Sequence, residues 1–282
     1  MELMIATRIF SPVGTALAVR DGLLAIHRNG GLVLHMTVRE LHDRYAGQML
    51  GIAWTVGTPL LAMATYVFAF TFIFRQRLGA DDAGNGYTAY VLAGLVPWLA
   101  ITDVLSRAPS AVSTNASLVK QIVFPSEVLP LRVALASIPQ LMVGLAVVLL
   151  ISAIAGRLHF HAIVLLPAAV VIYVLTMAGV AYVFAAIGVF IKDVREIVTF
   201  ATSIGLFLHP VLYSPASTPK WLLPIFYISP ASHLVWCFRD ALIEEHIIHP
   251  WSWLVASVFA IFVFATGWRF YRMLQPSFGN AL

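Results

Sequence analysis

The residues of this sequence that could do chemistry are few, and their spacing fits no catalytic or nucleotide-binding motif. Only three lysines occur, and none lies in G-x-x-x-x-G-K-[ST], so the chain has no P-loop to hold ATP phosphates. It contains neither H-E-x-x-H nor G-x-S-x-G. The nine histidines are scattered, which favours solvated or interfacial side chains over a metal site. We therefore expect no catalytic residue, no metal and no cofactor bound to this chain.

The composition places the chain in a membrane. Of its 282 residues, 60% are hydrophobic and 11% are charged, whereas soluble domains have about 25% charged residues. The net charge of +4 suits a protein whose cytosolic faces meet anionic lipid. No Lys/Arg cluster indicates nucleic acid, and the single cysteine, Cys237, excludes an intrachain disulfide. Acidic residues are nearly absent from the apolar stretches, which disfavours a proton- or sodium-driven transporter.

Six stretches approach the length of about 20 apolar residues that a transmembrane helix needs. We expect an all-α membrane protein of one domain, and no internal repeat is visible. The expected spans are Leu50–Phe74, Tyr87–Leu105, Val128–Ile154, Ala162–Ile191, Ile197–Leu212 and Trp251–Tyr271, of which the fifth is short.

The basic residues predict the orientation. The chain start lacks a continuous signal-peptide core, so we expect the N-terminus in the cytosol. Twelve of the 17 basic residues then lie on the cytosolic side and five outside, in agreement with the positive-inside rule. Both termini are therefore expected in the cytosol. The twelve are Arg8, Arg20, Arg28, Arg39, Arg44, Arg107, Lys120, Arg132, Lys192, Arg195, Arg269 and Arg272.

The segment Gly30–Met49 precedes the first span and has an amphipathic pattern. Four apolar residues share one helical face, and four charged residues lie elsewhere on the helix. This pattern predicts a helix lying in the membrane interface. The apolar residues are Leu34, Val38, Leu41 and Tyr45, and the charged ones are Arg39, Glu40, Asp43 and Arg44.

A second amphipathic helix is expected at STNASLVKQIVFP, between the second and third spans. Three N-cap candidates, Ser113–Asn115, precede an apolar set, and Pro125 ends the segment. The apolar residues are Leu118, Val119, Ile122 and Val123. This short capped helix would lie on the cytosolic side.

The segment between the fifth and sixth spans cannot form a straight helix, because five prolines interrupt it. Irregular backbone at membrane depth survives only when it is buried in protein or lines a wet cavity. We therefore expect a pair of short re-entrant helices that dip in from the outside. The prolines are Pro210, Pro215, Pro219, Pro224 and Pro230.

Several of these segments together resemble the permease subunit of bacterial ATP-binding-cassette polysaccharide exporters. They are AGLVPWLA, NASLVKQIVFPSEVLP, FIKDVREI, HPVLYSP and WLLPIFYISPASHLV, and the likeness extends from Leu34 to Met273. The family exports O-antigen, capsule, teichoic acid and related lipid-linked glycans. The resemblance implies a six-span homodimer in the bacterial inner membrane, paired with two ATPase subunits that bind ATP and Mg²⁺. One permease domain would then comprise a cytosolic and interfacial segment 1–49, six spans in 50–271, and a cytosolic tail 272–282.

The resemblance also implies an N-terminal interface helix, a cytosolic coupling helix and outer gate helices. The coupling helix would seat in a cleft of the ATPase, and the alternative is an ordinary surface helix that covers the inner ends of the spans. Many relatives carry a second basic residue after the lysine, where this chain has Gln121. The candidate coupling residues are Asn115, Ser117, Leu118, Val119, Lys120, Phe124 and Pro125.

Aromatic residues are the candidates for a gate or a sugar path, because sugar rings stack on aromatic planes without being fixed in position. The alternative is an interfacial aromatic belt. Tyr66 and Trp98 could face the same conduit, although core packing is the simpler interpretation for both. In the proline-rich segment the candidates are Tyr213, Trp221, Phe226 and Tyr227.

Arg39 and Arg44 are candidates to bind a lipid-linked pyrophosphate, since guanidinium groups bind phosphate oxygens bidentately. The alternatives are anchoring to bulk anionic lipid and salt bridges with Glu40 and Asp43. Two rival functions stay open at this point. One is a permease for a small lipid or drug, and the other is a membrane glycosyltransferase or acyltransferase.

Overall fold

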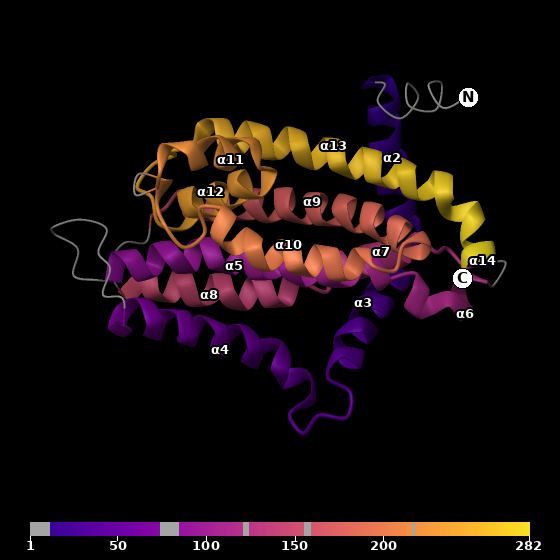
Figure 1. The fold of residues 1–282 in the computed structure, drawn as a ribbon, viewed down its shortest axis with the longest axis horizontal. Helices are drawn as coiled ribbons and strands as arrows, with labels where there is room; N and C mark the ends of the chain where they lie inside the picture. The colour runs from indigo at the N-terminus through magenta and orange to yellow at the C-terminus, as the bar shows by residue number, and fades with distance from the viewer. Residues whose placement is uncertain (1–11, 74–84, 121–123, 155–158, 216–217) are drawn as a thin grey trace.

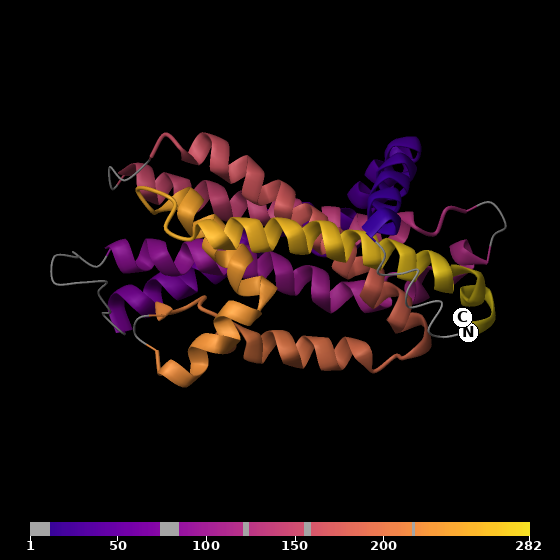
Figure 2. The same ribbon diagram turned by 90° about the horizontal axis from the view of Figure 1, so that it is seen from above.

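A computed structural model describes residues 12–73, 85–120, 124–154, 159–215 and 218–282, and over these ranges every regular element is a helix. Most helices run side by side along the long axis of the molecule (Figure 1). Two others, α2 (Pro12–Arg28) and α3 (Gly30–Arg44), lie across this bundle near one end (Figures 1 and 2). That end also holds α6 (Ala116–Val119) and α14 (Phe278–Ala281), and we call it the α6 end. The opposite end is the α12 end.

Within the described ranges, five helical stretches are long and apolar enough to cross a membrane, which confirms the all-α membrane fold. They are Gly51–Phe68, Tyr87–Ser110, Val128–Ile154, Ala162–Phe190 and Pro250–Ala281. These stretches correspond to five of the six expected spans. Their main helices are α4 (Trp54–Phe68), α5 (Asn85–Arg107), α7 (Val128–Leu135) with α8 (Ile138–Ile154), α9 (Ala162–Phe190) and α13 (Pro250–Leu274). A π-helical turn, Ala69–Ile73, extends α4, and Phe74 lies outside the described residues.

The fifth expected span is short, as predicted, but it begins three residues and ends four residues earlier in the chain than expected. Helix α10 covers Val194–Leu208, 15 residues, which is about 22 Å at 1.5 Å per residue, against a hydrocarbon core of about 30 Å. It ends because His209 precedes Pro210 and has extended backbone, with φ −114° and ψ 156°. Both views nevertheless show α10 running along the bundle from the α6 end towards the α12 end (Figures 1 and 2).

The proline-rich segment forms two short helices, α11 (Leu223–Ile228) and α12 (Pro230–Leu242). The axes of the segments Lys220–Ile228 and Pro230–Leu242 are bent by 88° at Ser229. In both views α10 ends, and α13 begins, in the half of the bundle where α11 and α12 lie (Figures 1 and 2). The chain therefore enters and leaves this bent pair at the same end of the molecule.

The N-terminal helices differ from the prediction in two respects. The segment Pro12–Arg28 forms α2, a helix that the sequence did not predict. Helix α3 ends at Arg44 instead of continuing to Met49, and Gly47 beyond it adopts a left-handed φ of 80°. Leu34 and Val38, on the predicted apolar face of α3, are 64% and 45% exposed.

Helices α9 and α13 share the most extensive helix–helix contact among the described residues. A Cβ on Gly267 would lie 2.3 Å from the carbonyl oxygen of Gly179, and a Cβ on Gly179 would lie 2.5 Å from the backbone nitrogen of Phe264. Only glycine allows this approach of two backbones, which is a usual way for membrane helices to gain packing contacts. The pair forms the rigid centre against which the elements of the two ends are placed.

Candidate functional site

The expected coupling segment is present, but its capping was predicted wrongly. Ser113–Asn115 forms a 3-10 turn and α6 spans only four residues. Asn115 occupies the N-cap position without capping the helix. Its side-chain amide donates instead to the carbonyl of Ala111 at 2.9 Å and to Thr114 Oγ1 at 3.1 Å. Short polar side chains often bond backwards to the preceding turn in this way, and here that removes the predicted cap. Ile122 and Val123, expected on the apolar face, lie outside the described residues.

The candidate coupling residues divide into two sets. Ser117 and Lys120 are exposed, whereas Asn115 and Pro125 are half-buried. Leu118, Val119 and Phe124 are half-buried and pack against the core. A cavity of about 530 Å³ separates this segment from the C-terminal residues, and its lining includes Val119, Lys120, Phe124, Gln275 and Asn280.

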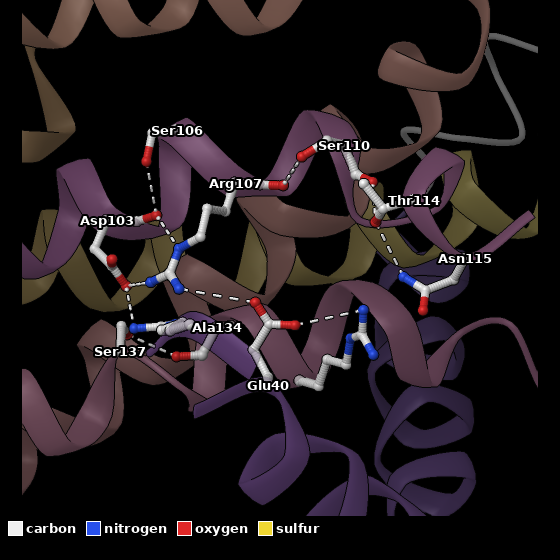
Figure 3. Close-up of polar contacts among 11 residues, drawn as sticks. Glu40, Asp103, Ser106, Arg107, Ser110, Thr114, Asn115, Ala134 and Ser137 are labelled. Atoms are coloured by element: carbon white, nitrogen blue, oxygen red, sulfur yellow. Dashed lines mark hydrogen bonds and ion pairs between the residues drawn. The ribbon is translucent and has the colours of Figure 1, made fainter. Parts of the chain in front are cut away.

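A chain of hydrogen bonds connects this segment to the end of α5 (Figure 3). Thr114 Oγ1 donates to the carbonyl of Ser110 at 2.8 Å, and Ser110 Oγ donates to the carbonyl of Arg107 at 3.1 Å. Arg107 Nε in turn donates to the carbonyl of Asp103 at 3.2 Å. These hydrogen bonds join successive turns of the backbone, so the end of α5 and the turn before α6 form one stiff unit.

Beside this unit lies a group of charged residues that we call the Glu40 cluster: Glu40, Arg44, Asp103, Arg107 and Arg132. Glu40 Oε1 lies 3.7 Å from Arg107 Nη1, and Glu40 Oε2 lies 3.4 Å from Arg132 Nη2 (Figure 3). Asp103 pairs with Arg107 and also with Arg44, at 3.4 Å. The cluster therefore ties α3 to α5 and α7 through ion pairs.

The charged side chains of the Glu40 cluster are largely buried, so an unbalanced charge among them costs stability. The exposed fractions of its side chains run from 8% for Arg132 to 22% for Arg107, with Glu40 at 17%. Three arginines face two carboxylates, and Arg44 Nε, Arg44 Nη2 and Arg132 Nε have no hydrogen-bond partner. Burial lowers the pKa of Arg44, and the Glu40 carboxylate opposes that shift.

The two arginines assigned to a pyrophosphate occupy different environments. Arg39 is exposed and pairs with Asp43 at 3.4 Å, with side chains 70% and 65% exposed. The side chain of Arg44 is 12% exposed and belongs to the Glu40 cluster. Arg39 thus faces away from the protein, whereas Arg44 lies between α3 and α5.

The candidate gate aromatics gather around α11 and α12 but do not share one surface. Phe226 is fully buried and its ring lies 6.0 Å from that of Tyr213, whose hydroxyl donates to the carbonyl of Phe207. Tyr227 is 60% exposed, beside Trp236 at 5.3 Å, and Trp221 is 72% exposed. Helix α11 therefore turns Phe226 inward and Tyr227 outward, whereas Trp236 of α12 is buried.

The two aromatic candidates on the first spans are Tyr66 and Trp98. Trp98 approaches the bend of α11 and α12 through His209, which bonds Ser229 at 2.7 Å. Trp98, on α5, is 4% exposed and its ring lies 4.8 Å from that of His209, after α10. Tyr66, on α4, is half-buried and packs against the hydrophobic core. In the single chain, both residues pack with the hydrophobic core.

Sequence reasoning missed two buried charges that hold α12. Arg239 is fully buried and donates to Tyr90 Oη at 2.8 Å and to the carbonyl of Val211 at 2.7 Å. Asp240, also fully buried, accepts from the backbone N–H of His249 and from Trp253 Nε1, both at 3.1 Å. Two adjacent charged residues inside an apolar segment indicate a functional or structural site. This sequence feature could have identified Arg239 and Asp240.

These features define a class: a multi-pass helical membrane protein whose buried polar contacts gather at the two ends of an apolar bundle. The chain belongs to the ABC-2 type transporter family, whose model matches residues 31–243. The matched range contains α3, the Glu40 cluster, α6 and the bent pair α11–α12. As a member of this family, the chain is a transport permease.

Three similar proteins extend the comparison. The O-antigen export system permease protein RfbA of Myxococcus xanthus is 31% identical over 193 residues, 68% of this chain and 72% of that protein. The protein of the same name from Klebsiella pneumoniae is 24% identical over 210 residues, 74% of this chain and 79% of that protein. The polysialic acid transport protein KpsM of Escherichia coli is 19% identical over 256 residues, 89% of this chain and 98% of that protein.

Proposed function

We propose that this chain is the transmembrane subunit of an ATP-driven exporter that moves a lipid-linked polysaccharide, of the O-antigen or capsule type, across the bacterial inner membrane. The observation that carries the proposal is that similar proteins named for O-antigen export or polysialic acid transport align with 68% to 89% of the chain. Two copies of the chain would pair with two ATPase subunits, which bind the ATP and Mg²⁺.

The α6 end is proposed to be cytosolic and to receive the ATPase. The excess of basic residues assigned to that side supports this orientation, with both termini inside. Exposed Ser117 and Lys120 would contact the ATPase directly, while Val119 and Phe124 would form the apolar wall of the contact. Segment 1–49 would be cytosolic and interfacial, residues 50–271 would hold six spans, and 272–282 would be a cytosolic tail.

The hydrogen-bonded unit between Asp103 and Asn115 gives the proposed coupling a physical route. A push on α6 would move the end of α5, since consecutive turns between them are joined by hydrogen bonds of 2.8–3.2 Å. The ion pairs of Glu40 would carry that movement to α3. ATP hydrolysis could in this way shift the interface helix where the lipid carrier enters.

We propose the substrate contacts from side chains that are exposed and from buried nitrogens that lack a hydrogen-bond partner. Arg39, whose side chain is 70% exposed, would bind oxygens of a pyrophosphate directly. Arg44 has two nitrogens without a partner, but they are buried, so it would bind the pyrophosphate only after α3 moves away from α5. At the α12 end, the rings of Tyr213, Trp221, Phe226 and Tyr227 would form a gate and a sugar path. In the dimer, Tyr66 of α4 and Trp98 of α5 would face the same conduit.

Deletion of the gene tests this function in the cell. We expect loss of one surface polysaccharide, accumulation of its lipid-linked form inside, and restoration of both by the intact chain. A normal surface polysaccharide together with loss of a small lipid or drug efflux activity would contradict the proposal.

A further inference from the structure

A cavity of the α6 end lies between α2 and α13 and includes none of the residues of the Glu40 cluster or of α6. Its volume is about 880 Å³, and its walls are α2 and the last turns of α13. The two helices cross there, α2 lying across the bundle and α13 along it (Figures 1 and 2). The cavity is thus formed where a helix that crosses the membrane meets one that lies across the bundle.

Close packing at Gly22 fixes the position of α2 on α13. A Cβ on Gly22 would lie 3.0 Å from Phe264 Cε1 and 3.4 Å from Trp268 Cδ2. Ala18, one turn earlier on α2, is 6% exposed, and Trp268 is 5% exposed. The close contact between α2 and α13 therefore forms the floor of the cavity. The side chains on either side of this contact form the rim of the cavity.

The rim combines positive charge with exposed apolar side chains. Three arginines, Arg28, Arg269 and Arg272, line the cavity together with two carboxylates, Asp21 and Glu127. Glu127 Oε1 already lies 3.7 Å from Arg272 Nη1, and Asp21 is exposed. The cavity thus has an excess of one positive charge.

Two leucines and a methionine stand beside these charges. Leu17 and Leu24, on α2, are 51% and 54% exposed, and Met273 is 45% exposed. Apolar surface of this kind is unfavourable in water, but it suits a site that reaches the boundary between lipid chains and headgroups. Trp268, in the same wall, is of a residue type enriched at that boundary.

We propose that this cavity binds an anionic phospholipid, with the headgroup phosphate against the three arginines and an acyl chain along Leu17 and Leu24. Basic pockets between membrane helices on the cytoplasmic side suit anionic headgroups, and the volume lies within the range of ligand sites. The bound lipid would fasten α2 to α13. This site is distinct from the proposed substrate contacts at Arg39 and Arg44 and does not depend on what the protein exports.

The test measures lipid binding to the purified protein. The protein in neutral detergent is titrated with phosphatidylglycerol or phosphatidylcholine, and bound lipid is counted by native mass spectrometry. We expect preferential binding of phosphatidylglycerol, and a loss of affinity of about fivefold for each of Arg28→Gln, Arg269→Gln and Arg272→Gln. The control is Arg195→Gln, which changes an exposed arginine on α10, outside the cavity, and leaves the affinity unchanged.

Arg272→Gln also removes the Arg272–Glu127 ion pair and so could disturb the fold. A variant at a residue outside this pair therefore completes the test. Leu24→Glu alters an exposed position and introduces a repelling charge, so it should weaken phosphatidylglycerol binding without lowering the temperature of unfolding. Three results would each overturn the proposal: equal affinity for the two lipids, an equal loss in Arg195→Gln, or displacement of phosphatidylglycerol by inorganic phosphate at equal concentration, which would indicate a site for free anions.

Discussion

Replacing Glu40 by glutamine should destabilise the α6 end of the bundle, because Glu40 is the only carboxylate that pairs with both Arg107 and Arg132 among the described residues. Glu40→Gln keeps the shape of the side chain and removes its charge. Three arginines of the Glu40 cluster would then face Asp103 alone. The change therefore tests whether the cluster holds α3 against α5 and α7.

The magnitude follows from burial and geometry. Removing one partner of a buried ion pair costs about 3–5 kcal/mol. The lower end applies here, since Glu40 is 17% exposed and its two ion pairs, at 3.4 and 3.7 Å, are longer than close hydrogen bonds. A loss of about 3 kcal/mol corresponds to a fall of about 6–12 °C in the unfolding temperature for a domain of this size.

Thermal unfolding in detergent, followed by tryptophan fluorescence, measures this effect. Asp43→Asn is the matched control, because it breaks the neighbouring Arg39–Asp43 pair on the same helix, where both side chains are mostly exposed. Such a pair contributes at most about 1 kcal/mol, so the control should shift the unfolding temperature little. Adding Arg132→Met to Glu40→Gln should restore part of the loss, since it removes one uncompensated charge.

Equal unfolding temperatures for Glu40→Gln and Asp43→Asn would refute this reasoning. They would show that the cluster is hydrated enough for its ion pairs to contribute nothing measurable. An unchanged loss in the double variant would equally show that Glu40 acts without Arg132.

Three further predictions concern topology, coupling and the gate. The topology is tested on a Cys237→Ala background with Lys220→Cys and Ser117→Cys, two exposed positions at opposite ends of the molecule. A membrane-impermeant thiol reagent added outside should label Lys220→Cys and not Ser117→Cys. The reverse labelling pattern would show that the proposed topology is inverted. Val119→Asp should reduce both ATPase copurification and export, because an unpaired carboxylate in an apolar contact costs several kcal/mol; normal export would exclude α6 as the docking element. Alanine at Tyr213, Trp221, Phe226 and Tyr227 together should open an ATP-independent leak in proteoliposomes, whereas Trp221→Ala alone, at a position 72% exposed, should stay tight. A quadruple variant as tight as the parent would identify these rings as a lipid-facing belt.

Much of the fold could be predicted from the sequence because hydropathy depends on local composition. The long apolar runs became α5, α7 with α8, α9 and α13, and the prolines between Pro210 and Pro230 accompany the bend of 88° between the segments that contain α11 and α12. The prediction was wrong at two helix ends. Asn115 does not cap α6, because its side-chain amide bonds backwards to Ala111. Helix α10 ends at Leu208 and not at Leu212, because Pro210 forces extended backbone on His209.

The charged sites could be predicted less well, because their partners are distant in the sequence. Glu40 pairs with residues 67 and 92 positions away, at Arg107 and Arg132, and nothing local to α3 identifies them. The buried pair Arg239 and Asp240 was visible as two charges in an apolar segment, but its contacts with Tyr90 and Trp253 depend on tertiary packing. Helix α2 was missed since Arg20 and Asp21 interrupt its apolar pattern.

The most direct test of the proposed function is transport by the reconstituted complex. The permease and its ATPase are inserted together into proteoliposomes that carry a lipid-linked polysaccharide in the leaflet facing the ATPase, and protected glycan is measured with an impermeant glycosidase or lectin. We predict ATP-dependent movement of the glycan to the opposite side, reduced in Val119→Asp and absent without the ATPase. ATP hydrolysis by the intact complex without any movement of the glycan would contradict the assignment of this permease to polysaccharide export.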